Sequence, residues 1–393
     1  MAHPTDRFPL SWFCHGHEVY GVGTAAFSLA AEMHRRGWPV QLLHTHPGTT
    51  ADRFADAGMH TRLLKLDAVP DTYGGSLPAK LWKFARGRKV DRNTGNALRS
   101  AIQDFGGKHF HVLWPFHVRA AVEATKPIAT RCFWEMPNFV NDRYPFELNK
   151  RVYQRLCREG NVTVLADSAA TGRTLAGRGV EPITFYHASR TDHFDPTRVE
   201  RDRARLGLPE SAAVFVIAAR LVADKGGMHL LRAAAVHPTT PSGRPVHVAL
   251  VGGSKDDAFP NELRRVADEL GVADRLHLPG ELTDVRPWYA AADVSCNLRV
   301  APEPFGLSVI ESMLMGVPVL VHAHGGPAET VRDGGTGWHI TGMDQESVNA
   351  GMARVLADES RWPAFGESAR MRGLTHFSDV ALADHYERLL VSG

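Results

Sequence analysis

The stretch Ala-Pro-Glu-Pro-Phe-Gly-Leu-Ser-Val-Ile-Glu, residues 301–311, carries two glutamates eight positions apart, Glu303 and Glu311. A Pro/Gly break follows the first glutamate, and the second lies early in an apolar helical pattern. This arrangement places two carboxylates beside a helix N-terminus, where free N–H groups and the helix dipole favour an anion. It therefore indicates a site for a phosphorylated sugar. Acidic residues are also common as helix caps and dipole partners, and the spacing alone leaves that alternative open.

Length and composition describe a globular protein of more than one domain. The chain has 393 residues, which favours two domains of ordinary size. Its 44% hydrophobic and 22% charged content is typical of a compact fold. The 45 basic and 43 acidic residues leave a formal charge of +2, which gives no global field for nucleic acid or an acidic membrane. We therefore expect no nucleic-acid partner.

The sequence also bears on location and on thiol chemistry. Residues 1–10 contain no apolar signal region, and no segment reaches the length of about 18 apolar residues needed to span a bilayer. We expect a cytoplasmic protein. The four cysteines, Cys14, Cys132, Cys157 and Cys296, have no paired spacing, which favours reduced interior thiols over a disulfide framework or a zinc site.

Short apolar runs alternate with helical patterns along the whole chain. This alternation predicts an α/β protein with parallel sheets built from βαβ units. The strands expected in the first half are residues 10–14, 40–45, 62–66, 110–114, 128–133, 162–166 and 183–186. Those expected in the second half are residues 213–219, 246–251, 276–278, 294–297 and 317–321.

A polar, charge-rich stretch at residues 190–205 interrupts the alternation. We therefore expect two doubly wound domains, residues 1–189 and 190–374, facing each other across a cleft. The C-terminal segment, residues 375–393, is expected to be a helix that packs back on the N-terminal domain. Ligands are expected where strand carboxyl ends meet helix N-termini.

Two glycine-containing turns follow strands and open helices. Gly21-Val-Gly23 partly resembles a dinucleotide fingerprint, but the second strand ends in His44-Thr-His46 where that fingerprint has an acid. A phosphate contact and a plain tight turn remain open for this segment. Arg220 and Lys225-Gly226-Gly227 follow the strand at residues 213–219, and two cations beside a helix N-terminus suit a diphosphate. A solvated polar loop is the alternative.

Taken together, the motifs resemble glycosyltransferase family 4 over roughly residues 10–391. The resemblance rests on Gly21-Val-Gly23, Arg36-Gly37, Arg220 with Lys225-Gly226, residues 303–311, Gly325-Gly326-Pro-Ala-Glu329 and residues 333–337. It implies a GT-B fold of two Rossmann-like domains and a retaining, metal-independent transfer from a nucleotide-diphosphate sugar. The substrates would be a UDP- or GDP-sugar and a hydroxyl acceptor, with no separate cofactor. Asp-x-Asp, the usual metal-binding pair, does not occur in the chain.

The resemblance also implies roles for individual residues. Arg220 and Lys225 would neutralise the diphosphate as it leaves, Glu303 would hold the donor sugar, and His117 would lie near the reacting centre. Glu311 would accept hydrogen bonds from the ribose. The remaining donor-binding residues would be Gly21, Gly23, Gly252, Gly253, Pro279, Gly280, Phe305, Gly306, Leu307 and Ser308.

The N-terminal domain would bind the acceptor. Trp134, Glu135 and Asn138 follow an expected strand, and they would line the acceptor site with one stacking face and two polar groups. A loop that packs Trp134 into the core is the alternative. The sequence departs from the family pattern at residues 297–300, where Asn-Leu-Arg-Val replaces the usual Pro-Ser, so the donor sugar is not fixed by the resemblance.

A basic segment raises one more expectation. Residues 67–93 are read as a long loop, and residues 80–92 within it carry six basic residues against one aspartate, with apolar residues interleaved. This segment is a candidate for weak contact with an anionic membrane surface, and a solvated loop is the alternative. The sequence does not define an oligomeric state. A phosphorylase of the same fold and a non-catalytic sugar-nucleotide binder remain the competing functions.

Overall fold

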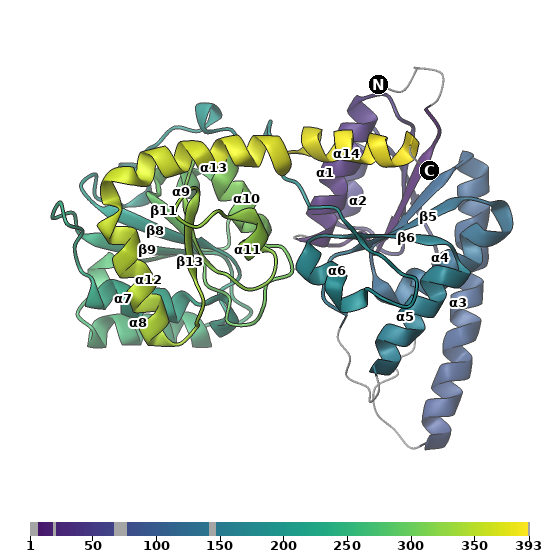
Figure 1. Ribbon diagram of the computed structural model, residues 1–393, viewed down its shortest axis with the longest axis horizontal. Helices are drawn as coiled ribbons and strands as arrows, with labels where there is room; N and C mark the ends of the chain where they lie inside the picture. Colours follow the sequence, from purple (N-terminus) through teal and green to yellow (C-terminus); the bar gives the residue numbers. More distant parts are fainter. Residues whose placement is uncertain (1–6, 19–20, 67–76, 141–146, 392–393) are drawn as a thin grey trace. The chain divides into compact units, whose positions relative to one another are not determined.

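The computed structural model describes residues 7–18, 21–66, 77–140 and 147–391, and for residues 77–86 and 391 it describes the backbone alone. The chain forms two compact units. The first contains residues 1–187 and 382–393, and the second contains residues 188–381. The second unit thus extends to Ala381, and the chain returns to the first unit within its last helix, beyond the expected boundary at residue 375. Figure 1 shows each unit as a sheet with helices on both faces.

The first unit is built on a seven-stranded sheet in the order β3-β2-β1-β4-β5-β6-β7, with every pair parallel. Its strands are β1 Leu10–Cys14, β2 Val40–His44, β3 His60–Leu63, β4 His109–Val112, β5 Arg131–Met136, β6 Val162–Ala166 and β7 Ile183–Thr184. Its helices are α1 Val22–Arg35, α2 Thr49–Asp56, α3 Leu77–Phe105, α4 Val118–Thr125, α5 Leu148–Glu159, α6 Ala169–Leu175 and most of α14, Asp379–Val391. All seven expected strands are present, and each end lies within three residues of its predicted position.

The prediction of a long loop at residues 67–93 is wrong over most of that segment. Helix α3 begins at Leu77 and runs unbroken to Phe105. No proline lies in the helix beyond its first turn, and Val90, Leu98 and Ile102 are buried, so helix-forming residues and a packed apolar side support the whole element. Residues 80–92, the segment expected to contact a membrane, are therefore helical, and the side chains of residues 80–86 are not described. The membrane contact stays a prediction.

Alternation along the central strands separates two faces of the first sheet. Cys132, Trp134 and Met136 of β5 join the core beneath α3 to α6. The side chain between the last two, Glu135, is buried in a polar network with strands β1 and β4 and helix α14. Successive residues of a strand point to opposite faces, which accounts for this division.

The polar network attaches α14 to the first sheet. Glu135 Oε1 accepts hydrogen bonds from Trp12 Nε1 (2.8 Å) and from His111 Nδ1 (2.6 Å). A carboxylate can only accept, so His111 carries its proton on Nδ1, and its Nε2 accepts from the hydroxyl of Tyr386 at 2.6 Å. The Trp12 and His111 rings stack at 4.4 Å. All four side chains are buried, so the network holds α14 in one position on the sheet.

The second unit is built on a six-stranded parallel sheet in the order β10-β9-β8-β11-β12-β13. Its strands are β8 Ala213–Ala218, β9 Val246–Val251, β10 Leu276–Gly280, β11 Val294–Asn297, β12 Val319–His322 and β13 Gly337–Ile340. Its helices are α7 Gly227–Val236, α8 Ala258–Glu269, α9 Arg286–Ala291, α10 Leu307–Leu314, α11 Pro327–Thr330, α12 Gln345–Ala357 and α13 Trp362–His376. Strand β13 was not predicted, and the other five were.

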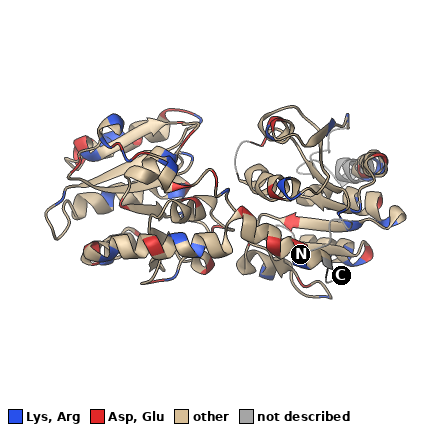
Figure 2. Ribbon diagram, turned by 90° about the horizontal axis from the view of Figure 1, so that it is seen from above, with Lys and Arg blue, Asp and Glu red and all other residues tan. Residues whose placement is uncertain are grey.

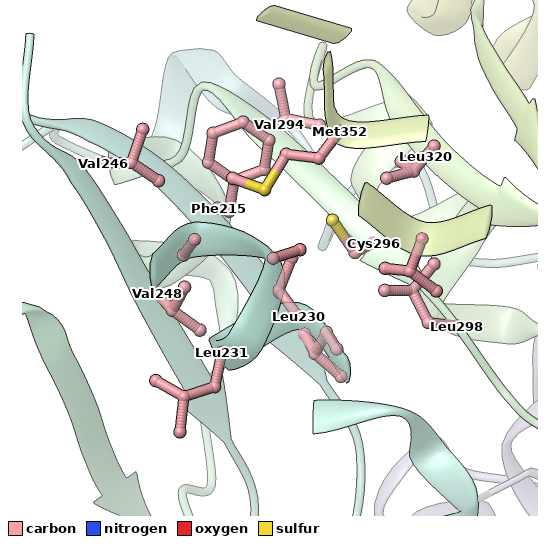
Figure 3. Close-up of a cluster of buried hydrophobic side chains, with 14 of the residues drawn as sticks. Phe215, Leu230, Leu231, Val246, Val248, Val294, Cys296, Leu298, Leu320 and Met352 are labelled. Carbon is pink, nitrogen blue, oxygen red and sulfur yellow. The ribbon is translucent and has the colours of Figure 1, made fainter. Parts of the chain in front are cut away.

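Two apolar layers cover this sheet. Helices α7, α8 and α12 pack on one face and α9, α10 and the end of α13 pack against the other. Figure 3 shows the first layer, where Leu230 and Leu231 of α7 lie against Phe215, Val248 and Cys296 of the strands. Both faces of the sheet are therefore buried, and the residues at its carboxyl-terminal edge are left for ligand contact.

Charge and hydropathy agree with the composition. Basic and acidic segments are interspersed along both units in Figure 2, and the formal net charge of the chain is +2. Among the described residues, no helix has both the length and the apolar character that crossing a bilayer requires. The four cysteines are all buried and free, and burial raises the pKa of the Cys132 and Cys157 thiols to about 12.

The α14 network predicts a stability effect. Tyr386→Phe removes the donor to His111 Nε2 and leaves a buried acceptor unsatisfied, so we expect the free energy of unfolding of the first unit to fall by about 1–3 kcal/mol. Urea unfolding followed by tryptophan fluorescence measures the change. Leu148→Ala, an exposed substitution in the first unit, serves as the control and is expected to shift the value by at most about 0.5 kcal/mol. An unchanged unfolding curve for Tyr386→Phe would contradict this role of the hydroxyl.

Candidate active site

Consecutive loops are joined by backbone hydrogen bonds along the carboxyl-terminal edge of the second sheet. After β9 and β10, the N–H of Gly252 donates to the carbonyl of Gly280 at 3.0 Å. After β8, the N–H of Leu221 donates to the carbonyl of Gly253 at 2.8 Å. The predicted donor-binding glycines Gly252, Gly253 and Gly280, with Pro279 at the end of β10, thus line one edge together with the loop that carries Arg220.

The same edge continues through the loops after β11 and β12. The N–H of Val300 donates to the carbonyl of Asp224 at 2.9 Å, and the N–H of Gly326 donates to the carbonyl of Glu303 at 2.9 Å. These bonds fix the two acidic residues in neighbouring loops although they are far apart in the sequence. The structure therefore brings the Lys225 loop and the Glu303 loop side by side.

Lys225 and Glu303 form an ion pair at this edge. Lys225 Nζ lies 3.1 Å from Glu303 Oε2. Arg299 Nη1 lies 3.4 Å from the other oxygen, Oε1, and Arg299 Nε lies 2.8 Å from Asp224 Oδ2. The pKa of Asp224 is lowered, because the hydrogen bond from Arg299 and the charges of Arg299 and Lys225 outweigh the effect of burial. Sequence reasoning identified Lys225 and Glu303; it noted Arg299 only as a departure from the family pattern.

Arg220 lies on the same loop as Lys225, but its side chain has different surroundings. Its side chain is exposed, and within the described part of the chain no hydrogen bond or ion pair engages its guanidinium. Arginine can grip two oxygens of a phosphate at once. The side chain of Arg220 is thus available at the end of β8 for an anion.

Two glycines allow the loops to approach this closely. Gly226 has φ +78°, and a Cβ on it would lie 2.1 Å from the carbonyl oxygen of Leu298. Gly325 has φ +92°, and a Cβ there would lie 2.0 Å from the carbonyl oxygen of Glu303. Any side chain at either position would separate the loops that hold Lys225 and Glu303.

The N-terminus of α10 follows the glutamate loop directly. Gly306, with φ +89°, precedes the helix, and the N–H groups of Leu307 and Ser308 in its first turn have no intrahelical acceptor. Asn297 Nδ2 donates to Ser308 Oγ at 3.4 Å. Phe305 is 2% exposed and packs edge-on against Phe377, so its side chain belongs to the core and its backbone alone is placed to contact a ligand.

Glu311 has a different environment from Glu303. It lies one turn into α10, where its Oε2 accepts from the hydroxyl of Tyr289 at 3.3 Å. Burial raises its pKa to about 7, and the Tyr289 hydrogen bond opposes this rise only in part. The carboxyl group therefore exchanges its proton near neutral pH, which makes it sensitive to what binds beside it.

In the first unit, Gly21 and Gly23 prove to have different tasks. Gly21 precedes α1 with φ +65°, and a Cβ there would meet no atom of the described residues within 4 Å, so its backbone is exposed on this side. Gly23 is buried, and a Cβ there would lie 2.4 Å from Thr50 Oγ1. Its lack of a side chain lets α1 pack against α2, which accounts for Gly23 without a phosphate. Tyr20, the other departure from the family pattern, lies outside the described residues.

His117 follows β4 and is 5% exposed. Burial, together with the charge of nearby His15, lowers its pKa to about 3 although Glu18 opposes this change, so the imidazole is neutral at physiological pH. Its Nε2 has no hydrogen-bond partner in the described part of the structure. A neutral imidazole with a free buried nitrogen can make one hydrogen bond to a ligand.

The burial of Trp134 and Glu135 contradicts their assignment to an acceptor site. Trp134 is 1% exposed and packs against Tyr153 in the core, as the alternative interpretation held. Glu135 is 6% exposed and is engaged by Trp12 and His111. Both residues belong to strand β5, where neighbouring helices cover each face. Asn138, beyond the strand, is exposed and stays a candidate.

A different group of side chains lies at the carboxyl ends of β1 and β4. The Glu18 carboxylate accepts hydrogen bonds from the N–H groups of His15 (2.8 Å) and Gly16 (2.7 Å) and from Trp114 Nε1 (2.9 Å). These bonds outweigh burial and lower the pKa of Glu18. The Trp114 ring stacks on that of Phe116 at 5.9 Å, and Phe116 is 41% exposed. An ordered aromatic surface results.

This aromatic surface, defined by His15, Trp114 and Phe116, lies where the strand order of the first sheet reverses, between β1 and β4. Ligands of doubly wound sheets bind at such a point. The sequence contained the signals, His-Gly-His-Glu after one strand and Trp-Pro-Phe-His after another. Only the pairing of β1 with β4 shows that they meet.

Within residues 7–18, 21–66, 77–140 and 147–391, no three His, Cys, Asp or Glu side chains are placed to hold one metal ion. The cations that the described site offers to a diphosphate are Arg220 and Lys225.

Comparison with known proteins agrees with the sequence motifs. A family model described as "Glycosyl transferases group 1" matches residues 198–372. The D-inositol 3-phosphate glycosyltransferase 1 of Catenulispora acidiphila is 34% identical over 381 residues, which cover 88% of this chain and 89% of that protein. The lipopolysaccharide core biosynthesis glycosyltransferase LpsE of Rhizobium meliloti is 31% identical over 191 residues, 49% of this chain and 53% of its own.

Solved structures share the fold at low sequence identity. A glycosyltransferase from Rickettsia africae has a TM-score of 0.82 at 16% identity, over 98% of both chains. HepE of Anabaena, in complex with UDP and glucose, has a TM-score of 0.76 at 18% identity, over 98% of this chain and 99% of that one. These likenesses show that the two Rossmann-like units form a GT-B fold. The chain belongs to the glycosyl transferases group 1 family, glycosyltransferase family 4, and is a retaining glycosyltransferase that uses nucleotide-sugar donors.

Proposed function

We propose that the protein transfers a hexosyl group from a UDP- or GDP-sugar to a hydroxyl acceptor, with the donor bound by the second unit and the acceptor by the first. The observation that carries the proposal is the ion pair of Lys225 with Glu303 at the carboxyl-terminal edge of the second sheet. A cation for the diphosphate and a carboxylate for the sugar lie within one hydrogen bond of each other there.

Each donor-side group has a task that its chemistry suits. Arg220 and Lys225 neutralise the diphosphate, and Glu303 accepts hydrogen bonds from sugar hydroxyls. The N–H groups of Leu307 and Ser308 add donors at the positive end of α10. Glu311 accepts from the ribose hydroxyls with both carboxylate oxygens once its proton has left.

In the reaction, the bond between the anomeric carbon and the diphosphate oxygen breaks and a bond from that carbon to the acceptor oxygen forms on the same face. The electron pair of the broken bond stays on the diphosphate. The acceptor proton passes to an oxygen of the departing phosphate. Arg220 and Lys225 act most strongly as charge grows on that oxygen, so they stabilise the transition state more than the ground state.

On the acceptor side, the first unit supplies the aromatic surface of His15, Trp114 and Phe116. Aromatic rings stack on the apolar faces of sugar and polyol rings. The Nε2 of His117, which has no partner among the described residues, supplies one hydrogen bond nearby, since its ring lies 5.6 Å from that of His15. The relative from Catenulispora acidiphila is named for D-inositol 3-phosphate, which we therefore include among the acceptors to be tested.

The function itself is tested by calorimetry and product analysis. We expect UDP or GDP to bind, and we expect transfer from the matching sugar nucleotide with retained anomeric configuration by NMR. Turnover that requires inorganic phosphate in place of the nucleotide would instead support the phosphorylase. Binding without transfer to any acceptor would support a non-catalytic sugar-nucleotide binder.

Lys225→Ala should lower kcat/KM for transfer by about 10²–10³-fold, because a cation aimed at the leaving diphosphate is lost. Steady-state transfer assays measure this loss. Lys126→Ala, which removes an exposed lysine of the first unit, should leave kcat/KM unchanged. Transfer at the wild-type rate by Lys225→Ala would remove Lys225 from the reaction.

Donor affinity should depend on pH through Glu311. Since the pKa of its carboxyl group is raised to about 7, the group must lose a proton before it can accept from ribose, and binding should weaken as the pH falls below 7, by up to about tenfold per pH unit. Titrations with UDP-glucose and GDP-mannose, whose phosphates do not titrate in this range, measure the effect. Glu311→Gln should bind more weakly at pH 8 and lose the pH dependence. A pH profile identical to that of the wild type would contradict the assignment.

The acceptor surface should respond to Phe116. Because this ring is 41% exposed, Phe116→Ala should leave the fold and the donor KM unchanged while raising the acceptor KM by about tenfold, the loss of one stacking contact. Bisubstrate kinetics separate the two constants. Leu148→Ala, at another exposed apolar side chain of the first unit, is the matched control. An unchanged acceptor KM would place the acceptor elsewhere.

A further inference from the structure

The two oxygens of the Glu303 carboxylate each face a different cation. Lys225 Nζ lies 3.1 Å from Oε2, and Arg299 Nη1 lies 3.4 Å from Oε1. The Glu303 side chain is 15% exposed, so its charge is largely withdrawn from water and needs these partners. The proposed function assigns tasks to Lys225 and Glu303 and none to Arg299.

The two cations differ in how firmly they are held. Besides Glu303, the Arg299 guanidinium donates from Nε to Asp224 Oδ2 at 2.8 Å and from Nη1 to the carbonyl of Pro302 at 3.2 Å. For Lys225, Glu303 is the one side-chain partner among the described residues. Arginine forms a rigid planar fork, whereas lysine is a point charge on a flexible stem. Arg299 is thus the fixed cation and Lys225 the mobile one.

The backbone around Arg299 is fixed as well. Leu298, the preceding residue, is fully buried in the core shown in Figure 3. The Arg299 carbonyl accepts a hydrogen bond from His322 Nδ1 at 2.9 Å. Asp224, its carboxylate partner, also accepts from the N–H of Ala301 at 3.3 Å. Both the backbone of Arg299 and the Asp224 carboxylate that its guanidinium contacts are therefore held in place.

Donor binding makes conflicting demands on Lys225 and Glu303, which pair with each other in this structure. If Lys225 turns to the diphosphate, Glu303 loses the counterion on Oε2 at the moment when it must hold the sugar. A poorly solvated carboxylate that lost all its partners would move toward another cation or toward water. The contact from Arg299 to Oε1 survives that turn, because two other acceptors, Asp224 Oδ2 and the carbonyl of Pro302, keep the guanidinium in place.

We propose that Arg299 is a positioning residue of the transfer reaction, which keeps the Glu303 carboxylate oriented toward the donor sugar while Lys225 moves to the diphosphate. The inference rests on the proposed function. It makes Arg299 and its Asp224 partner determinants of sugar binding and turnover, although neither touches the diphosphate. Arg299 acts through Glu303, so replacing Arg299 should have little effect on transfer once Glu303 has lost the carboxylate that Arg299 holds.

The test compares nucleotides with and without the sugar, at pH 8. For Arg299→Met we expect the Kd for bare UDP or GDP to stay within about twofold of the wild type, since no sugar is present for Glu303 to hold. The kcat/KM with the matching sugar nucleotide should fall about 10–100-fold, the loss of a hydrogen bond to a charged group. Arg299→Lys, which keeps the charge but cannot span three acceptors, should recover part of this loss. Asp224→Asn should give a smaller loss in the same direction.

A double-mutant cycle with Glu303→Gln shows whether Arg299 acts through Glu303. We expect Arg299→Met to cost less than about twofold in the Glu303→Gln background. The matched control is Arg354→Met: Arg354 also pairs with an aspartate, Asp333, at 3.1 Å and donates to a backbone carbonyl, that of His339, but far from the site along the chain. This variant should transfer at the wild-type rate.

Three outcomes would overturn the inference alone. Arg299→Met could transfer at the wild-type rate, it could weaken bare UDP or GDP as much as the sugar nucleotide, or its effect could add fully to that of Glu303→Gln. Failure of the proposed function looks different: the wild-type protein would bind neither UDP nor GDP, or Glu303→Gln would transfer normally, and the inference would fall with it.

Discussion

The ion pair of Lys225 with Glu303 depends on the parallel pairing of β8, β11 and β12. These residues are 78 positions apart in the sequence, and strand β11 between them pairs with both neighbours. Because parallel strands end at the same edge, the loops after β8 and β11 must meet there, and the loop after β12 joins them. Glycines at 226 and 325 then allow contact between backbones that side chains would keep apart. The site therefore depends on the order of the strands and on the presence of glycine at these two positions.

Much of this fold could be predicted from the sequence because strands buried on both faces are continuous apolar runs. That pattern located twelve of the thirteen strands that the described residues form; the missing one, β13, contains Gly337 and His339 and lacks such a run. The error at α3 has the opposite cause. Glycines and prolines around residues 70–78 and a polar, basic composition resemble a loop locally, whereas the helix is stabilised by packing against α4, which no local pattern contains.

The site was predictable where its residues are neighbours in one motif and unpredictable where tertiary packing decides. Glu303, Glu311 and Lys225 stand in short motifs whose chemistry is local. Trp134 and Glu135 stand in a comparable position after an apolar run, yet the strand continues through both. One side chain enters the core and the other meets Tyr386, which arrives from the far end of the chain. The aromatic surface was missed for the same reason, since its halves are separate loops that only β1–β4 pairing joins.

The two glutamates that decide the fold assignment are chemically unlike in the folded protein. Glu303 lies between two cations, whereas Glu311 lies in α10 beside an uncharged tyrosine, where burial favours its protonated form. A retaining hydrolase would need two carboxyl groups flanking one glycosidic bond, with one kept as an acid and the other as a nucleophile. Here Glu311, which holds a proton near neutral pH, lies one turn inside α10, and the carboxylate of Glu303 is already engaged by Lys225 and Arg299. This arrangement suits a pair that grips the two ends of a sugar nucleotide, and it leaves the charge of bond breaking to the cations.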